Sequence, residues 1–255
     1  MTTIDLNSDI GESFGVYRLG ADAELLRHVS SANIACGFHA GDPQTMADTV
    51  AAALSAGVAI GAHPGLNDLI GFGRRTVHLS AREAYNITLY QIGALKVFVE
   101  AAGGKLAHVK AHGALYNQAA KDEELARALC KATAAVDAKL VFFGLPGSKL
   151  VSAAHEFGLT VANEVFADRT YQDDGSLTPR SRPDAMVTDV NVAIRQIMDM
   201  LNHGIVKSTN GVAVKVQADT LCIHGDSPGA AEFARGLREA LDKEGVVIRA
   251  PSLRH

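Results

Sequence analysis

Four histidines of this chain share one local setting, directly after a short apolar run and within two residues of a glycine. They are His39, His63, His112 and His224, in the segments CGFHAG, GAHPG, KAHGA and CIHGD. A single histidine after a strand is more often a structural hydrogen-bonding group, but four in equivalent positions indicate a shared polar site. A histidine there can act as a general acid or base, or bind a metal through a neutral ring nitrogen.

Carboxylates, an amide and a lysine lie at the ends of the same apolar runs. These residues are Asn7, Asp9, Glu12, Lys110, Glu164 and Asp226. A carboxylate in such a place serves as a general base or a metal ligand, although Asp9 can instead simply form a turn with Gly11. Lys110 ends an apolar run, where an ammonium group can hold a carboxylate or stabilise an oxyanion.

Short apolar runs alternate with amphipathic helical segments, which predicts an α/β fold with a parallel sheet. We expect strands at 3–8, 32–36, 58–62, 106–110, 139–143, 159–163 and 219–223, and an edge or closing strand at 246–249. Seven or eight such units indicate a closed (β/α) barrel, with an open doubly wound sheet as the alternative. In either fold the carboxyl ends of the strands meet, so the polar residues above converge on one site.

Two helix starts and one histidine within a strand can also be predicted. Ser80 to Glu83 forms a capping box that starts a long helix, and Asp42 before Pro43 is expected to cap a helix rather than to catalyse. His108 lies inside a predicted strand, and we expect it to face a helix or the barrel wall.

The segment 164–184 is long, polar and rich in turn residues, which is typical of lids and binding loops. Its arginines, Arg169, Arg180 and Arg182, suit an anionic ligand. A solvated, flexible loop is an equally good interpretation of the same residues.

Bulk composition narrows the class of protein. The chain has 255 residues, 47% of them hydrophobic, a net charge of −4 and three cysteines, which we expect to be reduced because all three lie in apolar runs. The charge argues against a nucleic-acid partner, and we expect a single domain over residues 1–255 in the cytoplasm. The sequence contains neither a Rossmann fingerprint nor a P-loop.

Several long blocks resemble the LamB/YcsF family. They are DLNSDIGESFG, SANIACGFHAGDP, GAHPGLNDLIGFGRR, VKAHGALYN, EVFADRTYQDDGSLTPRSRPDA and CIHGDSP, in order from about Ile4 to Pro228. The resemblance implies a distorted seven-stranded (β/α) barrel of the glycoside hydrolase/deacetylase type. It also implies ATP-dependent opening of 5-oxoproline (pyroglutamate) to L-glutamate, as a 5-oxoprolinase subunit working with two allophanate-hydrolase-like partner subunits. ATP, with Mg²⁺, would be the co-substrate, and the missing P-loop favours its binding to the partners.

For this reaction the predicted catalytic residues have distinct roles. Asp9 or Glu12 would be the base, Lys110 the partner of the oxyanion or phosphate, and His112 or His224 the acid. The predicted substrate-binding residues are Asn7, His39, His63, Glu164, Arg169 and Asp226, with an arginine of the 164–184 loop as the anion clamp.

Two other functions remain open at the level of the sequence. One is a stand-alone metal-dependent deacetylase or amidohydrolase, and the other is a subunit that only binds substrate. We predict no metal on this chain, because histidine ligands that are gathered only through the fold are a weak signal in a sequence. If a metal is present, its predicted ligands are Asp9, His39, His63 and His112.

Overall fold

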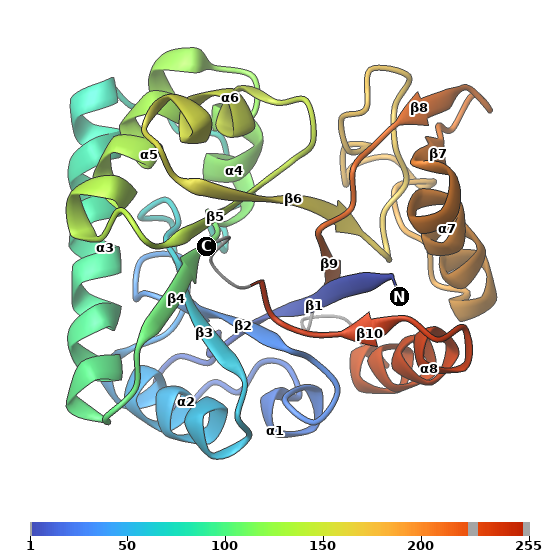
Figure 1. The fold of residues 1–255 in the computed structure, drawn as a ribbon. Helices are drawn as coiled ribbons and strands as arrows, with labels where there is room; N and C mark the ends of the chain where they lie inside the picture. Colours follow the sequence, from blue (N-terminus) through green and yellow to red (C-terminus); the bar gives the residue numbers. More distant parts are fainter. Residues whose placement is uncertain (1, 224–228, 252–255) are drawn as a thin grey trace.

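Seven parallel strands close into a barrel in the computed structural model, which describes residues 2–223 and 229–251 (Figure 1). The strands are β1 (Thr3–Ile10), β2 (Ser31–Ala35), β3 (Ala59–His63), β4 (Leu106–Val109), β5 (Val141–Gly144), β6 (Thr160–Phe166) and β9 (Thr220–Ile223). The barrel closes because β1 pairs with β2 on one side and with β9 on the other. The predicted seven-stranded barrel is confirmed.

Helices surround the strands (Figure 1). They are α1 (Asp22–Leu25), α2 (Pro43–Ser55), α3 (Ala81–Ala101), α4 (Gly113–Ala119), α5 (Glu123–Val136), α6 (Lys149–Glu156), α7 (Val190–His203) and α8 (Ala230–Lys243). The Ser80 capping box starts α3, and the Asp42 carboxylate caps α2, both as predicted. None of the helices in the described residues is both long and apolar enough to span a membrane.

Three further strands lie outside the closed ring. Strand β10 (Val247–Ile248) pairs with the start of β1, which confirms the predicted edge strand. Strands β7 (Ile205–Lys207) and β8 (Ala213–Lys215) form an antiparallel hairpin that the sequence did not predict. Each has only three residues, too few for a recognisable alternation of apolar and polar side chains.

The interior of the barrel is largely polar, whereas the main apolar core lies between the strands and the helices. Alternate residues of a strand face opposite sides of the sheet, and the inward-facing ones here bond to one another across the barrel. On β1, β2 and β9 these residues are Asp5, Asn7, Asp9, Ser31, Asn33, Thr220 and Cys222. The polar interior therefore leads directly to the carboxyl ends of the strands.

His108 lies inside this polar interior, so the expectation that it faces a helix or the barrel wall was wrong. Its Nε2 is 2.8 Å from Asn33 Oδ1, and its ring stacks on Phe143. The space comes from Gly61 on the neighbouring strand, where a Cβ atom would lie 2.1 Å from the His108 ring. A glycine in a central strand is thus required by the close approach of an imidazole.

The polar segment after β6 folds back onto the barrel. Strand β6 extends to Phe166, so Glu164 lies within the strand and the loop without helix or strand elements covers residues 167–189. Tyr171 is fully buried, and its hydroxyl oxygen accepts a hydrogen bond from the Phe166 N–H at 2.8 Å. The part of the loop around Tyr171 is therefore packed against the barrel, whereas residues 179–184 are exposed.

Candidate active site

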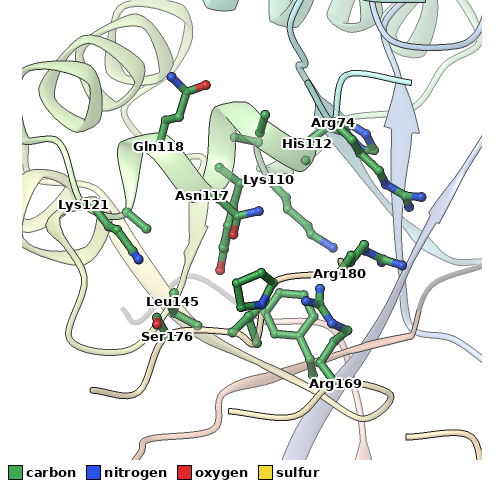
Figure 2. Close-up of a pocket in the computed structure, with 18 of the residues that line it drawn as sticks. Arg74, Lys110, His112, Asn117, Gln118, Lys121, Leu145, Arg169, Ser176 and Arg180 are labelled. Carbon is green, nitrogen blue, oxygen red and sulfur yellow. The ribbon is translucent and has the colours of Figure 1, made fainter. Parts of the chain in front are cut away.

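A cavity of about 450 Å³ opens at the carboxyl ends of the strands. Asp9, His63, Lys110 and His112 line its inner part, all four buried. Figure 2 shows Arg74, Arg169 and Arg180 on one side of the pocket, with Gln118 and Lys121 on the other. The inner end of the cavity therefore carries both a carboxylate and basic side chains, whereas arginines and a lysine make its mouth strongly cationic.

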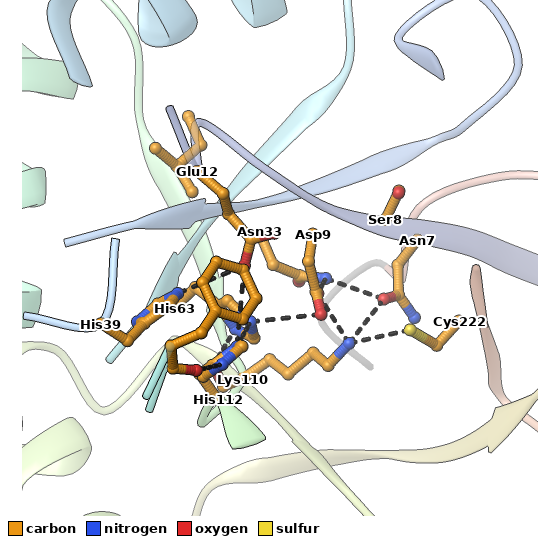
Figure 3. Close-up of polar contacts among 12 residues, drawn as sticks. Asn7, Ser8, Asp9, Glu12, Asn33, His39, His63, Lys110, His112 and Cys222 are labelled. Carbon is orange, nitrogen blue, oxygen red and sulfur yellow. Dashed lines mark hydrogen bonds and ion pairs between the residues drawn. The ribbon is translucent and has the colours of Figure 1, made fainter. Parts of the chain in front are cut away.

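Lys110 is the centre of the polar contacts at the base of the cavity (Figure 3). Its Nζ is 2.8 Å from Asp9 Oδ1, 3.0 Å from Glu164 Oε1 and 2.9 Å from Cys222 Sγ. Burial alone would lower the pKa of Lys110, but Asp9, Cys222 and Glu164 together raise it well above its ordinary value. The ammonium group therefore stays charged between two carboxylates.

Asp9 joins the lysine to the histidines. Its Oδ1 accepts hydrogen bonds from Lys110 Nζ and from Asn33 Nδ2, each at 2.8 Å. Its Oδ2 lies 3.2 Å from His63 Nε2. Asn7 lies two residues before Asp9 on β1. Its Oδ1 accepts a hydrogen bond from Asn33 Nδ2 at 2.8 Å, which holds the Asn33 amide in place.

Three imidazoles and one carboxylate form a compact group beside Asp9. His39 stacks on His112 with ring centroids 3.7 Å apart, and His63 meets both rings edge-on. Glu12 Oε1 is 3.3 Å from His39 Nε2 and 3.7 Å from His112 Nδ1. One ligand atom from each of the four residues lies within 4.8 Å of the other three, a donor set that is able to hold a metal ion.

The environment of His39 and His112 favours neutral imidazoles. Burial, followed by the neighbouring His63, lowers the pKa of His39 well below its usual value. Burial and then the neighbouring His39 do the same to the pKa of His112. In their neutral form both rings carry a lone pair that can accept a proton or bind a cation.

Two glycines hold the rings in position. A Cβ atom on Gly65 would lie 2.5 Å from His39 Nδ1. Gly73 has φ +61°, and a Cβ atom there would lie 2.7 Å from His39 Cβ and 2.9 Å from His112 Cδ2. The glycine-rich segment after β3 therefore packs its backbone directly against both imidazoles.

Arg169, the predicted anion clamp, lines the pocket and also has a structural role in its loop. The Arg169 guanidinium donates to Thr178 O at 2.5 Å and to Ala185 O at 3.3 Å, which ties two parts of the 167–189 loop together. Burial, together with the nearby Arg180, lowers the pKa of Arg169 to about 10. Arg182 pairs with Asp184 on the exposed surface and does not line the cavity.

Most of the site residues predicted from the sequence come together. They are Asn7, Asp9, Glu12, His39, His63, Lys110, His112 and Glu164, with Arg169 at the mouth. His224 and Asp226 lie outside the described residues. The possible metal group contains the three predicted histidines, with Glu12 in the place of Asp9.

The sequence interpretation missed Asn33, Cys222 and Arg74. A signal existed for Asn33, which is the only strongly polar residue in the apolar run ANIAC. Cys222 lies in an apolar run, which predicts a core thiol, and burial does raise its pKa well above the ordinary value although Lys110 opposes this. For Arg74 the sequence contains no signal beyond its glycine-rich surroundings.

Comparison with known proteins gives consistent matches over the whole chain. Residues 4–254 match the LamB/YcsF family. A 5-oxoprolinase subunit of Bordetella pertussis (strain Tohama I) is 59% identical over 247 residues, which cover 97% of this chain and 98% of the relative. The corresponding 5-oxoprolinase subunit of Bacillus subtilis (strain 168) is 54% identical over 252 residues, or 99% and 98% of the two chains.

Solved structures agree with the fold. The crystal structure of a lactam utilization protein from Thermus thermophilus has a TM-score of 0.93 and 48% identity, and the match covers 98% of this chain and 100% of the other. A putative cellobiose-phosphate cleavage protein from Enterococcus faecalis V583 has a TM-score of 0.58 at 13% identity, with 97% and 96% coverage. At that identity the second match shows a shared fold alone.

Proposed function

Because this chain belongs to the LamB/YcsF family, we propose that it is one component of an ATP-dependent 5-oxoprolinase. In this reaction the lactam of 5-oxoproline (pyroglutamate) opens to L-glutamate. The observation that carries the proposal is the 59% identity, over nearly the full length of both chains, to a relative named as a 5-oxoprolinase subunit. The cavity supplies groups that such a reaction needs.

The chemistry of the lactam sets these needs. An unstrained five-membered amide resists attack by water, so a phosphoryl group from ATP on the lactam oxygen would make the carbonyl carbon electrophilic. Water then attacks that carbon, the carbon–nitrogen bond breaks and the ring nitrogen takes a proton, which leaves an acyl phosphate. A second water releases inorganic phosphate from this acyl phosphate and gives L-glutamate. The site must stabilise developing negative charge, activate the water and hold the substrate carboxylate.

Lys110 is suited to stabilise negative charge on the lactam or phosphoryl oxygen. Its ammonium group lines the cavity and is charged, and in a buried site such a donor acts strongly on developing charge. Two neighbouring carboxylates, Asp9 and Glu164, hold it in one orientation. It therefore reaches the substrate already positioned.

Asp9 is the better of the two predicted bases. It lines the cavity, whereas Glu12 is not among the lining residues. The structure gives less support to His112 as the acid, because Nε2 already bonds to Phe72 O and Nδ1 faces His63. We therefore assign to Asp9 the activation of water and leave the proton donor for the ring nitrogen unassigned.

The substrate carboxylate and the phosphoryl group both suit the mouth of the cavity. Arg74, Arg169 and Arg180 line this part, and guanidinium groups bind carboxylates and phosphates through paired hydrogen bonds. ATP, with Mg²⁺, would be bound by the partner subunits, since this chain has no P-loop. The proposed complex contains two allophanate-hydrolase-like partner subunits and acts in the cytoplasm.

A second candidate follows from one observation, the group of Glu12, His39, His63 and His112. Such a group fits a metal-dependent amidohydrolase that acts without partners or ATP. The two candidates differ in what they need for turnover.

Glutamate release from 5-oxoproline separates them. We would assay this chain alone, the partner subunits alone and the mixture, each with and without ATP. Glutamate that appears only in the ATP-containing mixture is the expected result. Turnover of an amide by this chain alone, without ATP and abolished by a chelator, would instead support the second candidate.

A further inference from the structure

Two backbone carbonyls determine which ring nitrogen of His63 and of His112 carries a hydrogen. His63 Nδ1 is 2.7 Å from Lys110 O, and His112 Nε2 is 2.8 Å from Phe72 O. A carbonyl oxygen only accepts hydrogen bonds, so each of these nitrogens must carry its hydrogen. In a neutral ring the other nitrogen then has no hydrogen, which leaves lone pairs on His63 Nε2 and His112 Nδ1.

These two lone pairs face each other. His63 Nε2 and His112 Nδ1 are 3.0 Å apart, the distance of a hydrogen bond although neither neutral nitrogen can donate. Carboxylate oxygens face the same atoms, with Asp9 Oδ2 at 3.2 Å from His63 and Glu12 Oε1 at 3.7 Å from His112. Acceptors that converge in a buried space repel one another unless a cation lies among them.

A proton shared by the two nitrogens would satisfy only that pair. A metal ion would instead be held by Glu12, His39, His63 and His112, whose ligand atoms all lie within 4.8 Å of one another. We propose that these four residues form a binding site for one divalent first-row transition metal ion. This inference revises the sequence-based prediction of no metal and does not rest on the proposed lactam-opening chemistry.

The donor set selects the class of metal. Three imidazole nitrogens and one carboxylate oxygen suit Zn²⁺ and its neighbours in the first transition row, whereas Mg²⁺ and Ca²⁺ prefer oxygen ligands. Metal-bound histidines usually donate their second N–H to a carbonyl or a carboxylate, which fixes the ring orientation. His63 and His112 already do so, and both line the cavity, so the ion would lie at its inner wall.

Zinc binding to the isolated chain tests the site. The purified chain would be stripped with a chelator and titrated with Zn²⁺, with bound metal measured by equilibrium dialysis and elemental analysis. We expect one Zn²⁺ per chain, and at least about tenfold weaker binding in His112→Gln and in Glu12→Gln. His108→Gln is the matched control, because His108 is also buried in the barrel but bonds to Asn33 outside the group. Its zinc affinity should be unchanged.

A second readout covers variants that fold poorly. A ligand that binds only the folded state raises the unfolding temperature, so Zn²⁺ should raise the Tm of the wild type and of His108→Gln but not of His112→Gln. Absence of stoichiometric zinc in the wild type, or equal loss of binding in His108→Gln and His112→Gln, would overturn the proposal in favour of a shared proton. Neither readout involves 5-oxoproline, so failure here is distinct from failure of the proposed function.

Discussion

At the scale of single residues, the site depends on one buried cation and its anionic neighbours. Lys110 is 3% exposed and touches Asp9, Glu164 and Cys222. A buried ion pair contributes little net stability by itself, but removal of one partner leaves the other charges buried and uncompensated. We therefore expect Lys110 to contribute to folding as well as to the proposed catalysis.

Lys110→Met should lower glutamate release by the full complex at least about tenfold, because the charge on the reacting oxygen loses its partner. It should also lower the free energy of unfolding by roughly 3–5 kcal/mol, because Asp9 and Glu164 stay buried. Turnover and urea unfolding would both be measured, with Lys105→Met, an exposed lysine, as the control. Near-normal turnover in a folded Lys110→Met would contradict the assigned role.

Sequence reasoning located most of these residues but not their partners. Because the carboxyl ends of parallel strands lie at one edge of the barrel, the sequence predicts that Asp9, His63 and Lys110 share one site. Which atoms touch was beyond the sequence, since the pairing of His63 Nε2 with Asp9 depends on the relative stagger of β1 and β3. The proposed metal site was not predicted for the same reason: Glu12, His39, His63 and His112 follow or end separate strands, so they leave no short spacing in the chain.

At the scale of elements, the 167–189 loop forms part of the cavity wall. Leu177, Thr178, Pro179 and Arg180 line the cavity, and Arg169 ties them to the rest of the loop through Thr178 O and Ala185 O. The sequence identified the segment as a binding loop but left its order undecided. Tyr171 and Arg169 are buried and make hydrogen bonds to backbone groups within the loop or at its start, so these two side chains fix part of the loop.

Arg169→Lys should loosen this loop, because a lysine cannot reproduce both hydrogen bonds of the guanidinium group. We expect the KM for 5-oxoproline in the full complex to rise roughly fivefold, the equivalent of about 1 kcal/mol. Cleavage by a protease within residues 167–189 should also be faster. Arg182→Lys is the matched control, since Arg182 pairs with Asp184 on the surface. The same KM in both variants would show that Arg169 does not organise the pocket.

At the scale of the whole molecule, the barrel closes through the first strand. Asp5 of β1 accepts hydrogen bonds from Ser30 and Ser31, at the start of β2, and from Thr220 of β9. Burial raises the pKa of Asp5 to about 6, although these hydrogen bonds lower it in part. The strand order was predictable from the alternation of the elements, but the polar interior was not, since inward positions of a barrel are more often apolar.

Asp5 should make the stability of the barrel depend on pH. Between its ordinary pKa of 3.8 and its folded value of about 6, the folded chain holds a proton that the unfolded chain has released. Its stabilising contribution is therefore complete below pH 3.8 and is lost as the pH rises through 6. Relative to Asp5→Asn, the wild type should lose about 3 kcal/mol of unfolding free energy across this window.

Urea unfolding of wild type and Asp5→Asn at several pH values between about 4 and 7 would measure this difference. Asp48→Asn, which alters an exposed carboxylate on α2, is the control and should run parallel to the wild type. A difference between wild type and Asp5→Asn that does not change with pH would mean that Asp5 is ionised in the folded chain throughout.

The closure of the barrel through β1 also has a consequence during protein synthesis. Strand β1 leaves the ribosome before the other strands, yet the register Asp5↔Thr220 requires a residue made 215 positions later. Until then, β1 and β6 are open strand edges, and the inward-facing polar side chains lack their partners on β9. Open edges of this kind pair readily with other chains. The nascent chain should therefore depend on chaperones until β9 has been translated, more than a fold whose strands pair only with their neighbours in sequence.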